Sequence, residues 1–115
     1  MVTVRLAGAA DADEIGRIQV ETWRAAYKGL MPGEAIAEFD VALRQRLWRE
    51  GLARTPGPGS ATFVVEDSGE VVGFASVGAS RDREAEREAE LYAIYLHPSR
   101  WDRVELGLPL RLTVP

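Results

Sequence analysis

Hydrophobic and polar positions follow first the spacing of a strand and then that of a helix. Residues 2–6 alternate as a short strand, after which Asp11 and Glu14 have the spacing of a capping box. From about Asp13 to Tyr27 apolar residues recur every three or four positions, which predicts an amphipathic helix that covers a sheet. Its apolar positions form two neighbouring stripes, one of Ile15, Ile18, Thr22 and Ala26 and the other of Trp23, Tyr27 and Leu30.

Two further helices are predicted before the middle of the chain. Gly29 is suited to end the first helix, Pro32 to open the next, and Asp40 to cap a third. Residues 55–60 alternate proline and glycine and break the periodicity, so they are predicted to form a loop. The third helix carries the apolar residues Leu43, Leu47, Trp48 and Leu52.

The second half of the chain has the pattern of a sheet. Residues 62–66 and 71–77 are rich in β-branched and aromatic types, and residues 67–70 between them have turn chemistry, which predicts a hairpin. The charges of residues 80–88 alternate in sign, as is typical of a solvated connector. Residues 90–96 are apolar on both faces, which predicts a central strand that ends at His97-Pro98 because proline cannot donate a ladder hydrogen bond.

Composition favours a globular domain and removes several kinds of site. A length of 115 residues with 46% hydrophobic content predicts one domain with a packed core. The chain has no cysteine and one histidine, so neither a disulfide nor a metal site is expected. A formal charge of −4 without a basic cluster argues against nucleic acid and is compatible with a basic amine. Neither a membrane span nor a signal-peptide pattern is found, which favours a cytoplasmic protein without a membrane partner.

The segment Glu90–Pro98, an apolar-aromatic strand ended by a His-Pro pair, resembles the fourth strand of the GNAT superfamily of acetyl-CoA-dependent N-acetyltransferases. The segment Trp23–Pro32 is similar to one on the first helix of many small bacterial-type members. The resemblance covers Val4–Trp101. It implies an incomplete α+β fold of the acyl-CoA N-acyltransferase type, in the order strand, two helices and three strands.

The resemblance stops after Trp101. The family continues with a glycine-rich loop that binds pyrophosphate through backbone N–H groups and opens a long helix. In this chain Val104 and Leu106 stand where that loop has small residues, and Asp102 stands where a glycine is common. The side chains of Val104, Glu105 and Leu106 would block the pyrophosphate. Two prolines in residues 107–115 also argue against the long helix.

We therefore expect a partial N-acetyltransferase domain over residues 1–101 and an atypical tail over residues 102–115. Truncation or a frameshift after Trp101 would produce such a chain.

The resemblance assigns roles to residues of the fourth strand. Backbone groups of Ile94, Tyr95 and Leu96 would contact the pantetheine arm of acetyl-CoA, the cosubstrate, and stabilise the oxyanion of the tetrahedral intermediate. The same residues are equally typical of an ordinary core strand. Glu90 is the candidate general base for the attacking amine, with Glu88 as the second choice, although either could be a solvated acid.

Other site residues are assigned on the first helix. Trp23 and Tyr27 lie one turn apart, and the resemblance places them near the acceptor pocket, but aromatic residues at this spacing are also typical of a core. The general acid that protonates the thiolate comes from beyond residue 101 in the family and has no match here. His97 and Ser99 are two residues apart without the elbow motif of a nucleophile, so a covalent intermediate is not expected.

Two functions remain open from the sequence. The first is transfer of acetyl from acetyl-CoA to an amine by direct attack, with a small amine, an aminoglycoside, an amino acid or a protein N-terminus as acceptor. The second is a catalytically inactive GNAT-derived fragment that acts as an interaction or dimerisation module. An unpaired edge of the fourth strand and a partly uncovered sheet would favour such a homodimer.

Overall fold

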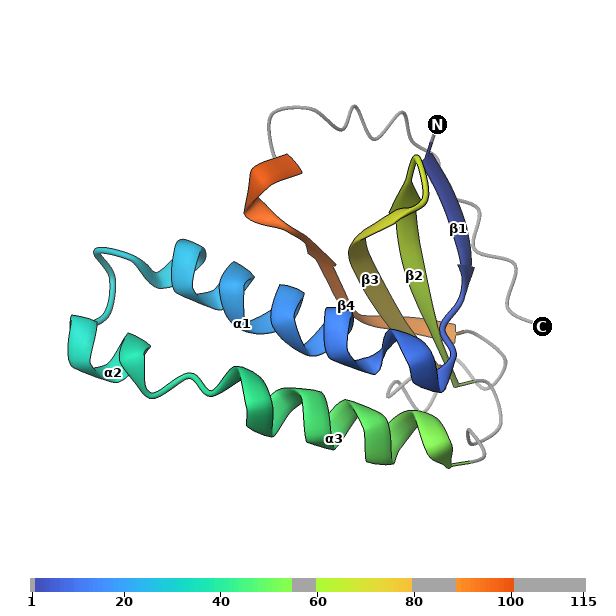
Figure 1. The fold of residues 1–115 in the computed structure, drawn as a ribbon, viewed down its shortest axis with the longest axis horizontal. Coiled ribbons are helices and arrows are strands. Elements are labelled where there is room, and N and C mark those ends of the chain that lie inside the picture. The colour runs from blue at the N-terminus through green and yellow to red at the C-terminus, as the bar shows by residue number, and fades with distance from the viewer. Residues whose placement is uncertain (1, 55–59, 80–88, 101–115) are drawn as a thin grey trace.

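The computed structural model describes residues 2–54, 60–79 and 89–100, which form an α+β fold (Figure 1). The loop predicted over 55–60, apart from Ser60, the connector over 80–88 and the tail over 102–115 lie outside this part. The order predicted from the sequence pattern, a strand, three helices and three strands, is confirmed, with one helix more than the family resemblance implies. The elements are β1 (Val2–Leu6), a 3-10 turn (Ala9–Asp11), α1 (Ala12–Tyr27), α2 (Gly33–Ala37), α3 (Val41–Ala53), β2 (Ala61–Asp67), β3 (Glu70–Ala79), β4 (Ala89–Leu96) and a second 3-10 turn (Pro98–Arg100).

The strands form one antiparallel sheet in the order β1-β2-β3-β4. The predicted hairpin joins β2 to β3 through Ser68 and Gly69, whose φ angles are 52° and 86°. Positive φ at both central residues is what a type I′ turn requires, and the twist of this turn matches that of the strands. Because each strand pairs with its sequence neighbour, β4 forms one edge of the described sheet and not the predicted central strand, and its residue Ile94 is 49% exposed.

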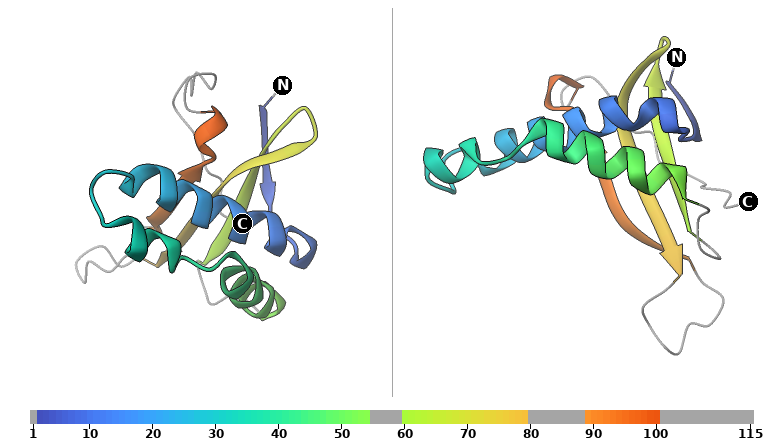
Figure 2. Two further views of the ribbon diagram at one scale, coloured as in Figure 1. Left: turned by 60° about the vertical axis from the view of Figure 1, so that its left-hand side comes forward. Right: turned by 60° about the horizontal axis from the view of Figure 1, so that its bottom comes forward.

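The two long helices lie on the same face of the sheet (Figure 2), and α2 extends beyond it (Figure 1). Gly16 allows α1 and α3 to approach, because a Cβ at this position would lie 2.7 Å from the backbone N of Gln45. Asp40 caps α3 as predicted, its Oδ1 accepting a hydrogen bond from the Leu43 N–H at 3.2 Å.

The core lies between this helical layer and the middle of the sheet. Trp48 of α3 meets Phe74 of β3 edge-on, with ring centroids 5.3 Å apart. The predicted stripe of α1 is confirmed at Ile15, Ile18 and Thr22, which are buried. Four residues without solvent exposure form the centre, Ile15, Ile18, Val64 and Phe74, and Ala7, Trp48, Leu52, Val71 and Tyr95 pack against them.

Five predicted apolar positions of the helical stripes are exposed, and two of them, Ala26 and Tyr27, lie in the last turn of α1. Leu30 is 79% exposed because Gly29, with φ of 82°, turns the chain away after the end of α1. Leu43 and Leu47 are also exposed, since α3 directs the later residues Trp48 and Leu52 toward the core. A periodic apolar stripe therefore overestimates how much of a helix is covered.

Asp11 is the N-cap residue of α1, as predicted, but its side chain makes no cap hydrogen bond to this helix, so the predicted capping box does not form. The chain enters α1 through the 3-10 turn, so the Asp11 carboxylate points back and accepts the Gly8 N–H at 2.8 Å. The Asp11 carboxylate also accepts one hydrogen bond from each terminal NH₂ group of the Arg5 guanidinium, both at 2.8 Å. This pairing with Arg5 holds the pKa of Asp11 below its ordinary value.

Candidate functional site

A β-bulge shapes β4. Leu91 pairs with Val77 and Ala93 with Ser76, so Tyr92 is an additional residue that has no partner of its own in the register. The predicted alternation of two faces along residues 90–96 is therefore interrupted. A bulge bends its strand and increases the local twist, so residues 94–96 follow a different direction from residues 89–91.

The backbone of residues 94–96 alternates between the sheet and its edge. The His97 N–H donates to the Val72 carbonyl at 2.8 Å, which extends the pairing of Tyr95 with Phe74. In an antiparallel pair, alternate residues direct both backbone groups to the partner strand. The groups of Tyr95 therefore point to β3, and those of Ile94 and Leu96 point to the outer edge of β4. Of the three residues whose backbone groups are predicted to contact pantetheine, Ile94 and Leu96 direct their N–H and C=O groups to the outer edge, and Tyr95 does not.

Gly73 fixes how closely β3 and β4 approach at this place. A Cβ on Gly73 would lie 2.5 Å from the Tyr95 carbonyl oxygen and 3.4 Å from Leu96 Cδ1. A residue with a side chain would therefore displace the backbone of β4, which explains a glycine inside this strand.

An aromatic cluster joins α1 to β4. The indole Nε1 of Trp23 donates to the Tyr95 hydroxyl at 3.2 Å, and Tyr95 stacks on Phe74 with a centroid distance of 4.8 Å. Phe39, between α2 and α3, meets two of the aromatic rings edge-on. Its ring centroid lies 5.6 Å from that of Trp23 and 6.2 Å from that of Tyr27. The structure thus brings Trp23 and Tyr27 into one cluster that touches β4 through Trp23.

Sequence reasoning missed Arg44, whose guanidinium lies 4.8 Å above the Trp23 ring. Its position one turn after the Asp40 cap gives no signal of this contact, because the contact depends on how α3 packs beside α1. It also missed Phe39, a single aromatic in a short link.

Glu90 lies near the other end of β4. Its backbone pairs with Gly78, four residues before Ile94, which corresponds to roughly 13 Å along a strand. Its role as base stays a prediction, and Glu88 lies outside the described residues. No group of three or more His, Cys, Asp or Glu side chains within the described residues could hold a metal ion.

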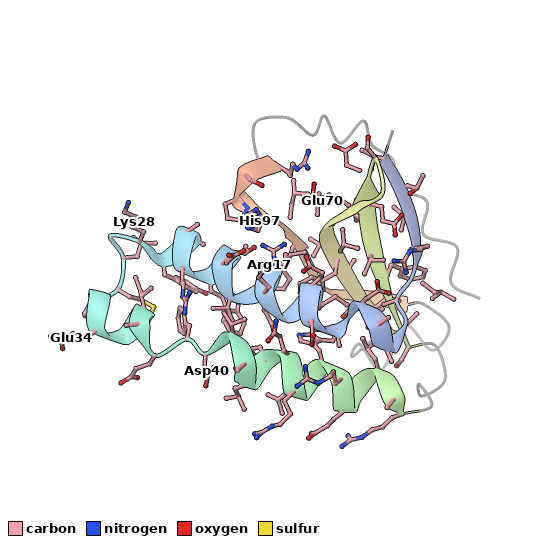
Figure 3. All side chains as sticks on the ribbon, viewed as in Figure 1. Arg17, Lys28, Glu34, Asp40, Glu70 and His97 are labelled. Carbon is pink, nitrogen blue, oxygen red and sulfur yellow. The ribbon has the colours of Figure 1, made fainter. Side chains whose placement is uncertain are left out.

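A polar network that the sequence does not predict lies at the exit of β4. In Figure 3, Arg17 and His97 lie close together between α1 and the end of this strand, whereas Lys28 and Glu34 lie at the far end of the helical layer. The Arg17 guanidinium forms ion pairs with Glu14 at 2.7 Å and with Glu21 at 2.6 Å. The hydrogen bond to Glu14 is the main cause that raises the pKa of Arg17.

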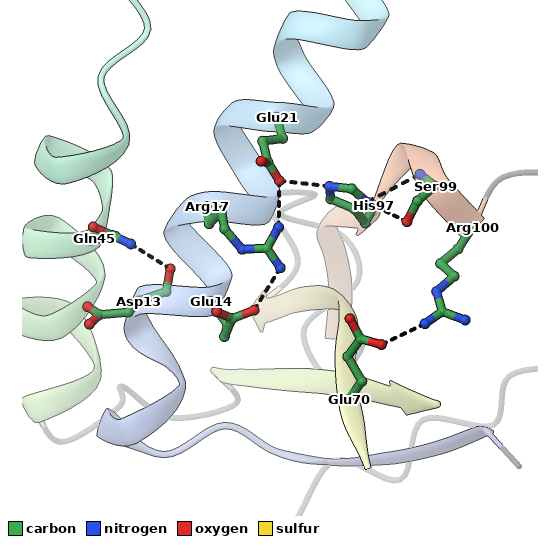
Figure 4. A network of polar contacts seen from close by, with 9 residues as sticks. All are labelled: Asp13, Glu14, Arg17, Glu21, Gln45, Glu70, His97, Ser99 and Arg100. Atoms are coloured by element: carbon green, nitrogen blue, oxygen red, sulfur yellow. Dashed lines mark hydrogen bonds and ion pairs between the residues drawn. The ribbon is translucent and has the colours of Figure 1, made fainter. Parts of the chain in front are cut away.

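Glu21 connects this network to the strand exit (Figure 4). Its Oε2 lies 2.7 Å from His97 Nε2, and His97 Nδ1 lies 2.7 Å from Ser99 Oγ. Arg100, the next residue, pairs with Asp67 at 3.1 Å and with Glu70 at 2.7 Å. The turn after β4 is therefore attached both to α1 and to the β2–β3 hairpin.

Comparisons with known proteins agree on one family. Residues 15–103 match the model of the acetyltransferase (GNAT) family. An uncharacterised N-acetyltransferase of Bacillus subtilis (strain 168), YuaI, is 33% identical over 101 residues, which are 87% of this chain and 55% of that protein.

Two solved structures have a similar fold. The PaiA N-acetyltransferase from Thermoplasma acidophilum, solved in complex with coenzyme A, matches with a TM-score of 0.61 and 15% identity over 90% of this chain and 63% of its own. Apo YjaB from Escherichia coli matches with a TM-score of 0.51 and 17% identity over 87% and 55%. This chain thus spans less than two thirds of the length of these relatives. Within its described residues, no helix is long and apolar enough to cross a membrane.

Proposed function

The chain belongs to the acetyltransferase (GNAT) family, and from this premise we propose that it transfers acetyl from acetyl-CoA to an amine by direct attack. In this step a nitrogen–carbon bond forms and the carbon–sulfur bond of the thioester breaks. The amine gives a proton to a base, and the departing thiolate takes one up. The coenzyme A in the PaiA complex supports acetyl-CoA as cosubstrate. We assign the partial domain to residues 1–101.

The observation that carries the proposal is the outer edge of β4 after the bulge. Ile94 directs its N–H and C=O away from β3, and the described residues form no strand beyond β4. Pantetheine carries amide groups, so it can pair with such an edge as an added strand does. An edge N–H near the thioester would also stabilise the oxyanion as the amine attacks.

The remaining groups are assigned around this edge. Glu90 on the same strand is the proposed base, and the cluster of Trp23, Tyr27 and Phe39 is the proposed wall of the acceptor site. Aromatic rings attract amine cations through their faces. A small amine or a protein amine therefore fits as acceptor.

Calorimetric titration with acetyl-CoA tests the cofactor site. Ile94→Pro removes the outward N–H without removing a ladder bond to β3, whereas Ile94→Ala removes the side chain and keeps the N–H. We expect saturable binding by the wild-type chain and by Ile94→Ala, and at least about tenfold weaker binding by Ile94→Pro, as one hydrogen bond predicts. Absence of binding by the folded wild-type chain would refute the cofactor site.

Release of free coenzyme A thiol in the presence of a panel of amines tests the transfer. Glu90→Gln should lower this release by roughly 10²-fold or more with little change in acetyl-CoA affinity, as expected for a general base. An unchanged rate in Glu90→Gln would exclude Glu90 as the base.

A second candidate function, self-association without catalysis, is favoured by the sheet face that lies away from α1 and α3. The register places Val4 and Leu6 on the same face as Val65 and Phe63, opposite to Val64 and Phe74 of the core. This face exposes the apolar residues Val2 (46%), Val4 (40%), Leu6 (51%) and Ile94 (49%). Exposed apolar surface beside the outer edge of β4, where the described residues form no further strand, favours a homodimer.

Light scattering over a range of concentrations tests this second candidate. A homodimer that Val4→Lys converts to a monomer would support it, and a wild-type chain that stays monomeric at all concentrations would refute it.

A further inference from the structure

We propose that Ser99 is an activated nucleophile that accepts an acyl group from reactive esters, with His97 as its base and Glu21 as the group that orients the base. This inference does not rest on the proposed acetyl transfer to amines, because it concerns a covalent step at a different side chain.

The three side chains form one line of hydrogen bonds (Figure 4). Ser99 Oγ lies 2.7 Å from His97 Nδ1, and His97 Nε2 lies 2.7 Å from Glu21 Oε2. A hydroxyl, an imidazole and a carboxylate in this order are the arrangement that activates a serine in unrelated hydrolases. The pair His97 and Ser99 alone lacks the third member, and Glu21 is supplied by α1, distant in the sequence.

The hydrogen bonds determine which nitrogen of His97 can accept a proton. The backbone N–H of Ser99 donates to His97 Nδ1 at 3.2 Å, so Nδ1 acts as an acceptor. Neutral imidazole carries one proton, which then lies on Nε2 and is donated to the Glu21 carboxylate. The Nδ1 atom that faces the Ser99 hydroxyl is therefore unprotonated, as a base requires.

The base is held from both sides. Glu21 Oε2 also accepts a hydrogen bond from Arg17 at 2.6 Å, and this second contact fixes the position of the carboxylate beside His97. The His97 backbone donates to Val72 at 2.8 Å and its carbonyl accepts from the Arg100 N–H at 2.9 Å. His97 is 22% exposed and Ser99 is exposed, so an ester can approach the hydroxyl without a rearrangement.

The acyl transfer balances without a further reactant. The Ser99 Oγ forms a bond to the acyl carbon and its proton moves to His97 Nδ1, while the bond from the acyl carbon to the leaving oxygen breaks. The leaving group then takes the proton from His97.

Little stabilisation of the oxyanion is available from the described residues around Ser99. The N–H groups of Ser99 and Arg100 are both used within the turn, and Pro98 has none. An aryl ester can acylate Ser99 without it because its aryloxide is a good leaving group, whereas hydrolysis of the acyl-serine, an ordinary alkyl ester, depends on this stabilisation. We therefore expect acyl-Ser99 to accumulate rather than turn over.

The test is incubation of the full chain with p-nitrophenyl acetate, followed by mass spectrometry of its peptides. We expect acetyl-Ser99 in the wild-type chain and none at this position in Ser99→Ala. His97→Gln should slow acetylation by roughly 10²-fold, and Glu21→Gln by roughly tenfold or more. Ser68, an exposed serine beside Asp67, is the internal control, and Ser68→Ala should leave acetylation of Ser99 unchanged.

The proposal is overturned if wild-type chain with native circular dichroism gains no more acetyl at Ser99 than at Ser68. It is also overturned if His97→Gln, equally folded, acetylates Ser99 at the wild-type rate. Because the aryl ester needs no coenzyme A site, either result leaves the acetyl-CoA titration to be judged independently.

Discussion

Replacing Gly73 by alanine tests the connection between the sheet and the proposed cofactor edge. The new Cβ would lie 2.5 Å from the Tyr95 carbonyl oxygen, whereas Cβ atoms in proteins essentially never come closer than 3.0 Å to such an atom. The strands must therefore separate by about 0.5 Å or more, the difference of these two distances. The obstructing atom belongs to the backbone, so a change of rotamer cannot relieve the contact, and the displacement reaches Ile94 and Leu96.

The expected magnitude follows from the cost of inserting a methyl group into a packed site. Such overpacking usually lowers the free energy of unfolding by about 1–3 kcal/mol. At about 4 °C per kcal/mol for a domain of this size, the melting temperature should fall by about 4–12 °C. Displacement of the binding groups by a fraction of an ångström should also weaken the binding of acetyl-CoA by about tenfold.

Thermal unfolding and calorimetric titration measure both effects on the same samples. Gly51→Ala is the matched control, because no heavy atom lies within 4 Å of the Cβ that it adds in α3. Alanine there should stabilise the helix by up to about 1 kcal/mol. If Gly73→Ala keeps the wild-type melting temperature and acetyl-CoA affinity, the close approach of β3 and β4 does not support the binding edge.

Three further predictions concern parts that hold the site in place. Asp11→Ala should lower the free energy of unfolding at pH 7 by about 1 kcal/mol in urea titrations, because it removes the partner of Arg5, whose solvent exposure screens the pair. Arg5 lowers the folded-state pKa of Asp11, so this stability is present above about pH 4 and disappears as the pH falls through the folded-state pKa. If Asp11→Asn shows the wild-type dependence of unfolding free energy on pH, this prediction is contradicted. A double-mutant cycle of Trp23→Phe and Tyr95→Phe should show a coupling of about 0.5–1.5 kcal/mol, and additive effects would mean that their hydrogen bond contributes nothing. Gly69→Ala should destabilise the hairpin by about 1–2 kcal/mol because φ is 86° there, and an unchanged midpoint in urea would refute this.

Local chemistry explains why much of the fold could be predicted. Asp40 caps a helix, Ser68 and Gly69 adopt hairpin angles, and Pro98 follows the end of a strand. Each feature depends on residues within a few positions of one another. The order of elements and the burial of Ile15 and Ile18 follow from such signals together with periodicity.

The parts that could not be predicted depend on contacts between distant segments. The bulge at Tyr92 leaves an apolar run that looks regular, because its composition gives no sign of an extra residue in the register. Glu21 has the pattern of a solvated helix position, and only the packing of α1 against β4 brings it to His97. Asp11 has cap chemistry, but the 3-10 turn before α1 directs it to Arg5 instead.

An NMR titration that follows single backbone amides tests whether the outer edge of β4 binds acetyl-CoA. The Ile94 amide points outward and the Tyr95 amide points to β3, so neighbouring signals serve as probe and reference. We expect acetyl-CoA to cause a saturable shift of the Ile94 signal that exceeds the shift of the Tyr95 signal. A folded chain whose Ile94 signal does not respond to acetyl-CoA would contradict it.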